Sequence, residues 1–350
     1  MQPSETGAYR DPKLDLLNRG RRSVCVDLKN PKSAGLILDL IENADALIEG
    51  FRPGVMERLG LGPEVCLKRN PRLVFGRMTG WGQDGTLAQV PGHDIDFIAL
   101  CGALHGIGRK GEQPIPPLNL VGDFGGGALY LAFGIVCALL ETRNSGQGQI
   151  VDAAMSDGVA SLMTMFHGLQ EMGRWDGDLG TSYLSGAAPY YDVYETADGK
   201  HVAVGAIESR FYDALLHGLE IDPAALPSRD DPDNWQAIRD AIASVFKRHS
   251  RDHWDKVLGR SDSCFAPILS ISEAPKHPHH LVRETYIEVD GITQPAPAPR
   301  FSRTPGAVQG PPPLPGTHTR SGLKDWGIED QQANDLIAAG VLFEKPKSGD

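Results

Sequence analysis

The sequence has little positive charge for its length. Its 34 lysines and arginines stand against 45 aspartates and glutamates, which gives a formal net charge of -11. Binding to nucleic acid requires clustered lysine and arginine side chains that neutralise phosphates, and this composition lacks them overall. We therefore expect no nucleic-acid partner, although local basic patches for a small phosphate-bearing ligand are compatible with the composition.

Cysteine is also scarce, and its spacing excludes two classes of site. Zinc sites and redox dithiols use closely paired cysteines, and no such pair is present. The residues 277–280 (HPHH) lack supporting carboxylates or cysteines, so we interpret them as a loop and expect no metal. Residues 1–9 carry no secretion signal, and we expect a cytoplasmic protein with reduced, mostly buried thiols. The five cysteines are Cys25, Cys66, Cys101, Cys137 and Cys264.

Long apolar runs and internal repeats are absent as well. The longest apolar run, residues 128–140, stops at Glu141. It is too short to span a bilayer, so we predict a buried helix and no membrane partner. No self-similarity at a fixed period is present, which excludes a solenoid.

What the sequence does contain is an alternation typical of an α/β protein. Residues 23–28, 46–51 and 73–79 have the character of strands, and residues 31–43 and 54–69 that of helices. This order predicts a parallel sheet with crossover helices. From about residue 189 the pattern changes to a hairpin around Asp198-Gly199, followed by amphipathic helices. We predict a large domain at 1–188, a smaller α+β domain at 189–304, and a linker with C-terminal helices at 305–350 that return to the large domain.

Two glycine-flanked motifs carry the candidate chemistry. Gly92-His93-Asp94 is followed thirty positions later by Gly122-Asp123, which leads through further glycines into the apolar helix. An imidazole and a carboxylate that face one carbon are what a two-base proton transfer requires. Glycine and a helix N-terminus also favour a developing oxyanion. The alternative is structural, with His93 capping one helix and Asp123 acting as the N-cap of a helix over residues 125–141.

Further motifs occur in order along the chain. They are residues 50–60 (GFRPGVMERLG), 77–83 (RMTGWGQ), 202–208 (VAVGAIE) and 299–302 (PRFS). With the two glycine-flanked motifs, they give a sequence that resembles the family III CoA-transferase superfamily from about Arg19 to about Gly340. Within that superfamily it is most similar to alpha-methylacyl-CoA racemases, especially bacterial ones. The resemblance implies an interlocked homodimer with a composite active site, an acyl-CoA substrate, and no cofactor, because the CoA moiety is part of the substrate.

The resemblance also implies roles for individual residues. His93 and Asp123 match the two bases, one abstracting the α-proton and the other delivering a proton from the opposite face. Glu208 matches the carboxylate that hydrogen-bonds the catalytic histidine and fixes its tautomer, here from a second subunit; its position before a helix also suits capping. Asp94 has a structural alternative, bonding the backbone of its own turn. The positions that match contacts to the CoA handle are Val26, Asp27, Leu28, Lys29, Gly50, Phe51, Arg52, Arg58, Gly92, Asp94, Ile95, Asp96 and Phe97.

Family members normally open with a strand, a small-residue turn and a helix that face the nucleotide, and this chain begins after that unit. We therefore expect an incomplete Rossmann-like large domain. The leading hypothesis is racemisation or epimerisation of 2-methylacyl-CoA thioesters by 1,1-proton transfer through an enolate. One alternative is a family III CoA-transferase in which Asp123 attacks a thioester. Another is an inactive truncated homologue. His93 favours the racemase, because transferases generally carry another residue there.

Four methionines gather in one predicted helical stretch. Methionine is a pliable apolar side chain, which suits ordinary core packing or an adaptable surface for varied acyl tails. The four are Met155, Met163, Met165 and Met172.

Overall fold

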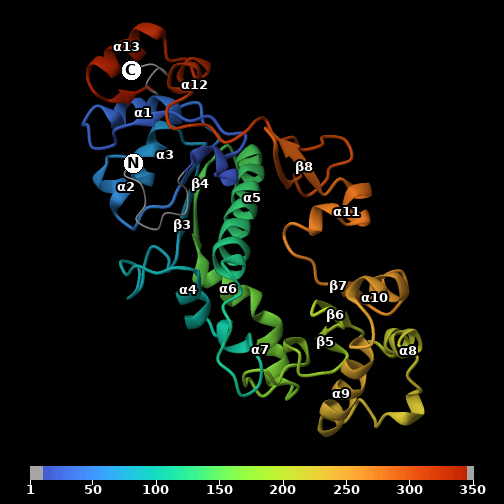
Figure 1. Cartoon of the computed structure of the whole chain (residues 1–350). Coiled ribbons are helices and arrows are strands. Elements are labelled where there is room, and N and C mark those ends of the chain that lie inside the picture. Colours follow the sequence, from blue (N-terminus) through green and yellow to red (C-terminus); the bar gives the residue numbers. More distant parts are fainter. Residues whose placement is uncertain (1–10, 345–350) are drawn as a thin grey trace.

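A three-stranded parallel sheet lies at the centre of the larger part of the chain, whose computed structural model describes residues 11–344 (Figure 1). The strands are β2 (Ala46–Glu49), β3 (Val74–Thr79) and β4 (Gln149–Ala154), in the order β2-β3-β4. Both faces of β3 are covered, and Val74 and Phe75 are fully buried. Burial on both faces explains why this strand begins with apolar residues, and Arg77, buried in its second half, has carboxylate partners. The predicted α/β class with a parallel sheet is confirmed.

Helices pack on both faces of this sheet. On one face α1 (Ser33–Ile41), α2 (Val55–Arg58) and α3 (Pro63–Arg69) surround the Phe75 side chain. On the other face α5 (Leu129–Ser145) packs Leu131 and Ile135 against Val74. Successive residues of a strand point to opposite faces, so adjacent Val74 and Phe75 belong to different cores. The remaining helices of this part are α4 (Asp94–Leu100), the π-helical segment η4 (Leu120–Ala128), α6 (Met155–Leu162) and α7 (Thr164–Glu171).

The first strand is not part of the parallel sheet, and this prediction was wrong. Strand β1 is only Cys25–Val26, and it pairs antiparallel with β10 (Leu342–Phe343) near the other end of the chain. Helices α12 (Thr319–Asp325) and α13 (Asp330–Ala338) lie beside α1 in Figure 1 and share an apolar cluster with it. Burial of Leu36 and Leu323 in that cluster sets the position of β1, which local alternation could not reveal.

The smaller part contains a three-stranded antiparallel sheet covered by helices. Its strands are β5 (Tyr191–Glu195), β6 (His201–Gly205) and β7 (Phe265–Pro267), in that order. The predicted hairpin is present, with Gly199 in the left-handed conformation (φ 72°) at its tip. The core is built by the helices α8 (Ser209–Gly218), α9 (Trp235–Phe246) and α10 (Arg251–Leu258). The boundaries proposed at residues 188 and 304 stay predictions.

A hairpin of β8 (Tyr286–Val289) and β9 (Ile292–Pro295) pairs only with itself. It is preceded by α11 (Pro278–Arg283). We expected residues 277–280 to be a loop, but residues 278–280 belong to this helix. Pro278 occupies the first helical turn, where its missing N–H costs nothing. Among residues 11–344, no group of three metal-ligating side chains is found. The short helices are η1 (Pro12–Leu14), η2 (Leu16–Asn18), η3 (Leu104–Gly106), η5 (Tyr183–Ser185), η6 (Pro223–Ala225), η7 (Pro232–Asn234) and η8 (Ala274–Lys276).

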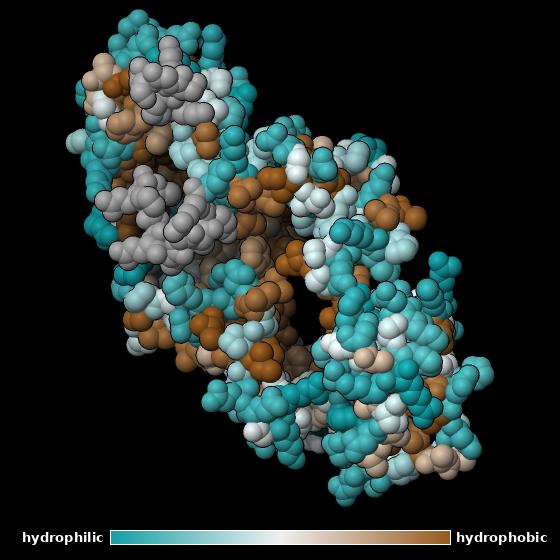
Figure 2. Space-filling view, in the orientation of Figure 1, coloured by the Kyte–Doolittle hydropathy of each residue, from teal (hydrophilic) through white to brown (hydrophobic). Residues whose placement is uncertain are grey.

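The long helix in the middle is not buried, contrary to our prediction. Residues 120–145 form 26 consecutive helical residues, long and apolar enough to cross a membrane, and only 28% of the most apolar stretch is buried. The sheet covers one face of α5, and Figure 2 shows apolar side chains along the middle of the molecule. A helix that is apolar all round requires a second partner for its other face. The exposed side chains of α5 include Leu129, Phe133, Val136 and Leu140.

The cysteines are less buried than we predicted. Only Cys66 is buried; Cys137 and Cys264 are exposed, and all five thiols are free. Burial raises the pKa of the Cys66 thiol to about 11, which makes it unreactive near neutral pH. The predictions for the chain ends, at residues 1–10 and 345–350, lie outside the described residues.

Candidate active site

A buried carboxylate joins the turn that carries His93 to the turn that carries Asp123. Asp94, the first residue of α4, is 6% exposed. Its Oδ2 accepts hydrogen bonds from the backbone N–H groups of Gly122 and Asp123, each at 2.7 Å. The expected bond within its own turn is therefore replaced by a bond to the other motif. The structure thus brings together the two segments on which the sequence hypothesis depends.

His93 occupies the N-cap position of α4 and is exposed. Its backbone N–H donates to the Asp96 carboxylate at 2.9 Å, which fixes the backbone at this point. Behind it, Phe97 is buried and meets Trp81 edge to face, with the ring centroids 4.8 Å apart. A Cβ on Gly92 would lie 2.7 Å from the Phe97 ring, so only glycine fits before His93. The His93 backbone is thus fixed above the packed Phe97 and Trp81 rings, while His93 itself is exposed.

We expected Asp123 to be the N-cap of the following helix, and this prediction was wrong. It lies inside the π-helical segment η4, which begins after Asn119 and continues directly into α5. Glycines allow this: Gly126 packs so closely on Gly158 that a Cβ on Gly158 would lie 1.8 Å from the Gly126 carbonyl oxygen. Asp123 is partly buried within this segment.

Asn119 orients the Asp123 carboxylate. It was not among the site residues predicted from the sequence. Its Nδ2 donates to Asp123 Oδ2 at 3.0 Å. The signal was available, because residues four apart share one face of a helix. It was hidden by the assumption that the helix starts at Gly125.

Glu208 lies in the smaller part of the chain, whereas His93 and Asp123 lie in the larger part. It is the exposed N-cap residue of α8, and its side chain makes no capping hydrogen bond. Burial is the largest cause that raises the pKa of the Cys264 thiol, and the negative charge of Glu208 is the second. Among the described residues of one chain, no hydrogen bond joins Glu208 to His93 or Asp123. Its support of the histidine stays a prediction that requires a second subunit.

An ion-pair network with a buried centre, Arg77 and Glu49, underlies the loop after β2. Arg77 Nε lies 2.9 Å from Glu49 Oε1, and Arg77 Nη1 lies 2.8 Å from Glu57 Oε1. The other Glu49 oxygen accepts the Phe51 N–H at 2.7 Å. The Arg77 guanidinium holds the pKa of Glu57 below its usual range. Arg77 was not among the predicted residues, although a charged residue within an apolar strand was a visible signal.

The residues expected to contact the CoA handle divide into three places. Gly50, Phe51, Arg52 and Arg58 are exposed at the carboxyl edge of the parallel sheet. The segment 26–29 begins with the last residue of β1 and is tied to the C-terminal part, because the Asp27 N–H donates to the Val341 carbonyl at 2.9 Å. The segment 92–97 exposes Ile95 and Asp96 but buries Asp94 and Phe97.

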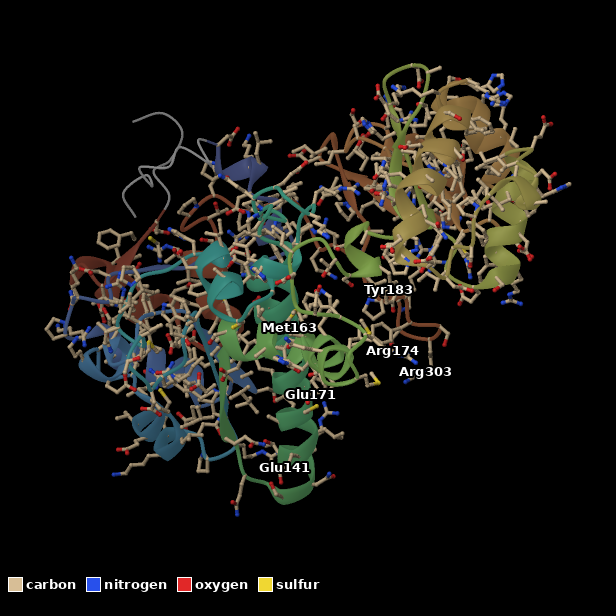
Figure 3. All side chains as sticks on the ribbon, turned by 90° about the horizontal axis from the view of Figure 1, so that it is seen from below. Glu141, Met163, Glu171, Arg174, Tyr183 and Arg303 are labelled. Atoms are coloured by element: carbon tan, nitrogen blue, oxygen red, sulfur yellow. The ribbon has the colours of Figure 1, made fainter. Side chains whose placement is uncertain are left out.

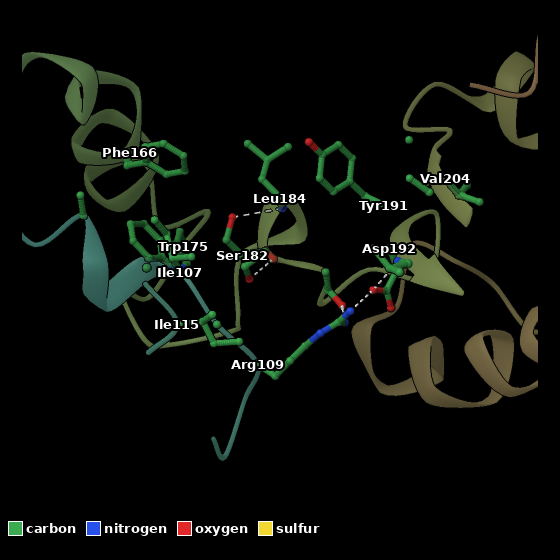
Figure 4. A pocket seen from close by; sticks show the side chains of 18 of the residues that line it. Ile107, Arg109, Ile115, Phe166, Trp175, Ser182, Leu184, Tyr191, Asp192 and Val204 are labelled. Atoms are coloured by element: carbon green, nitrogen blue, oxygen red, sulfur yellow. Dashed lines mark hydrogen bonds and ion pairs between the residues drawn. The ribbon is translucent and has the colours of Figure 1, made fainter. Parts of the chain in front are cut away.

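A cavity of about 900 Å³ lies between the larger part and the antiparallel sheet. In Figure 4 the Trp175 and Ile107 side chains lie on one side, and Tyr191 and Val204 on the other. Val121, two residues before Asp123, is also part of the lining. The cavity is therefore connected to the segment that carries the candidate carboxylate base.

Arg109 reaches across this cavity to Asp192, where Nη2 and Oδ1 are 2.5 Å apart (Figure 4). Asp192 is buried and also pairs with Arg239 of α9. A buried carboxylate with two arginine partners fixes the loop after η3 against the smaller part.

The methionine stretch lies along the same region. Figure 3 places Met163 between the two parts of the chain, and Met163 lines the cavity. Met165 is 52% and Met172 62% exposed, so core packing does not describe these two residues.

Comparison with known proteins gives a family and close relatives. The model for "CoA-transferase family III" matches residues 1–319. The alpha-methylacyl-CoA racemase of Mus musculus is 42% identical over 331 residues, which cover 94% of this chain and 87% of the relative. That of Homo sapiens is 39% identical over 328 residues, covering 93% and 86%. The crystal structure of a CAIB/BAIF family protein from Brucella suis superposes with a TM-score of 0.75 at 22% identity, over 88% of this chain and 82% of that one. The chain belongs to CoA-transferase family III.

Proposed function

We propose that the protein racemises or epimerises 2-methylacyl-CoA thioesters by 1,1-proton transfer at C2. The observation that carries this is the pair of hydrogen bonds that the Asp94 carboxylate accepts from the N–H groups of Gly122 and Asp123, which holds the His93 turn against the Asp123 turn. The racemases of mouse and human, 42% and 39% identical, give independent support. CoA transfer needs the carboxylate alone and gives no role to His93.

The mechanism requires two groups on opposite faces of one carbon. One base takes the α-proton, the thioester carbonyl carries the enolate charge, and the other group returns a proton to the opposite face. Asn119 holds the Asp123 carboxylate by a hydrogen bond at 3.0 Å, which fixes the direction of its free oxygen. The backbone bond from His93 to Asp96 at 2.9 Å fixes the starting point of the imidazole. Exchanging the roles of the two groups gives the reverse reaction, and no redox cofactor is needed.

The two ends of the substrate have separate candidate positions. Arg52 and Arg58 are exposed beyond the carboxyl ends of the strands, where open α/β sheets bind ligands and where guanidinium groups can bind phosphate oxygens. The apolar lining of the cavity of about 900 Å³, which includes Val121, Met163 and Phe166, suits the acyl tail.

The decisive experiment is incubation of a single stereoisomer of a 2-methylacyl-CoA in deuterium oxide without any added acid. We expect deuterium at C2 together with loss of optical purity, measured by mass spectrometry and chiral chromatography. A CoA-transferase would instead leave C2 unlabelled and exchange CoA only when a second carboxylic acid is supplied. That outcome would contradict the proposal.

We also propose that the active protein is a cytoplasmic homodimer with a composite site. The exposed apolar face of α5 supports a second subunit, since an apolar helix face of this size is rarely left in water. Glu208 is far from His93 and Asp123 in the sequence and forms no hydrogen bond with them within the described part of one chain, which is consistent with a site in which the second subunit supplies Glu208. Free thiols are consistent with a reducing compartment.

The dimer proposal predicts the effect of one charge on α5. Phe133 is 71% exposed, so Phe133→Asp should leave each folded subunit intact and shift the sedimentation of the protein from dimer to monomer. Deuterium incorporation should fall with it. Asn144→Asp, near the polar end of the same helix, is the matched control. A dimer that persists with Asp at position 133 would exclude this face as the interface.

A further inference from the structure

We propose that Asp94 is a positioning residue whose buried carboxylate sets the spacing between the two proton-transfer groups. This inference rests on the proposed function, because it assigns the spacing to a reaction at one carbon. Asp94 itself is 6% exposed, so it acts through its neighbours and not on the substrate.

The hydrogen bonds define what the carboxylate does. The same carboxylate oxygen, Oδ2, accepts both hydrogen bonds, from the N–H groups of Gly122 and Asp123, each at 2.7 Å. Oδ1 is buried and has no hydrogen-bond partner among residues 11–344. A buried carboxylate with an unpaired oxygen is unfavourable for stability. Stability alone therefore gives no reason for this arrangement, whereas a rigid connection between two catalytic turns does.

The packing around Gly122 shows that the connection is tight. A Cβ on Gly122 would lie 2.7 Å from Asp94 Oδ2 and 2.9 Å from its Cγ. No side chain fits between the two segments while the hydrogen bonds persist. Any residue other than glycine at position 122 must push the Asp123 turn away from the His93 turn.

The same connection reaches His93 through the backbone. His93 precedes Asp94 directly, and its N–H is bound to Asp96 in the same helical turn. The His93 carbonyl accepts the N–H of Asp96 at 2.8 Å, so His93 moves with the first turn of α4. A shift of Asp94 relative to Gly122 is thus a change in the separation of the two bases.

The test compares three variants for deuterium incorporation at C2 and for KM of the acyl-CoA. Asp94→Ala removes the acceptor, and we expect kcat to fall about 100-fold with KM changed less than about 3-fold, because a shift of about 1 Å at reacting groups has that effect. Asp94→Asn keeps a carbonyl oxygen that can accept both N–H groups, and should retain kcat within about 5-fold. Gly122→Ala should lower kcat as Asp94→Ala does. Gly168→Ala, where a Cβ meets nothing within 4 Å, is the control.

A double variant separates positioning from general damage. In Asp94→Ala/Gly122→Ala the added methyl no longer meets a carboxylate and keeps only the 3.2 Å contact with the backbone carbonyl oxygen of residue 94, so the double variant should be at most slightly slower than Asp94→Ala alone. Additive losses would overturn the proposal, as would a near-normal kcat in Asp94→Ala or an Asn variant as slow as the Ala variant.

A readout without activity keeps this inference separate from the proposed function. Hydrogen exchange of the Gly122 and Asp123 amides should be faster in Asp94→Ala and protected in Asp94→Asn, whichever reaction the protein performs. If the wild-type protein labels no substrate, the proposed function fails while this measurement still stands. Unchanged amide protection in Asp94→Ala would show that Asp94 does not hold the turn.

Discussion

His93→Ala and Asp123→Asn are each expected to lower kcat for C2 epimerisation by about 10²–10⁴-fold, the usual contribution of a positioned acid or base. Either change removes one of the two groups, so a proton taken from one face can no longer be returned to the other. The measurement is the rate at which optical purity at C2 is lost, followed by chiral chromatography with each stereoisomer as the starting substrate, because the remaining base can still exchange deuterium on its own face. CoA affinity should stay close to that of the wild type.

The design of the Asp123 variant limits other effects. An asparagine there keeps an oxygen that can accept the Asn119 amide, whose bond to Asp123 is 3.0 Å long in the native chain. Asn119→Asp would instead place two carboxylates side by side and is not a neutral control. Wild-type turnover in either the His93 or the Asp123 variant would remove the two-base mechanism.

Arg77→Met is expected to lower the free energy of unfolding by about 3–5 kcal/mol, because it leaves a buried carboxylate without its partner. The Glu49 side chain is 3% exposed and lies 2.9 Å from Arg77 Nε. Urea unfolding followed by circular dichroism measures the change. The loop after β2 should also loosen, since Glu49 holds the Phe51 N–H.

Two controls test whether the buried charge is the cause. Arg69 pairs with Asp39 and Glu42 at the surface, and Arg69→Ala should cost less than about 1 kcal/mol. Arg77→Met/Glu49→Leu removes both charges and should recover part of the loss, because an apolar pair of similar volume replaces them. A double variant that is less stable than Arg77→Met would refute this explanation.

The order and spacing of motifs in the sequence were enough to predict the α/β class, the family and the two glycine-flanked segments. Strand β3 and the Asp198-Gly199 hairpin could be predicted because their patterns are local: a buried run, and a turn that requires glycine. His93 was placed at a helix start for the same reason. Local chemistry determined these features, and local chemistry is what a sequence displays.

Contacts between distant segments were decided only by the tertiary structure. Cys25 pairs with Phe343, and the Asp94 carboxylate binds the turn of Asp123, because burial of apolar surface brings these segments together. The close packing of Gly126, three residues after Asp123, against Gly158 is another such contact. The sequence by itself determined which groups are available for the reaction. Only the fold decided their spacing, since the free energy that fixes it comes from packing and hydrogen bonds between segments far apart in the chain.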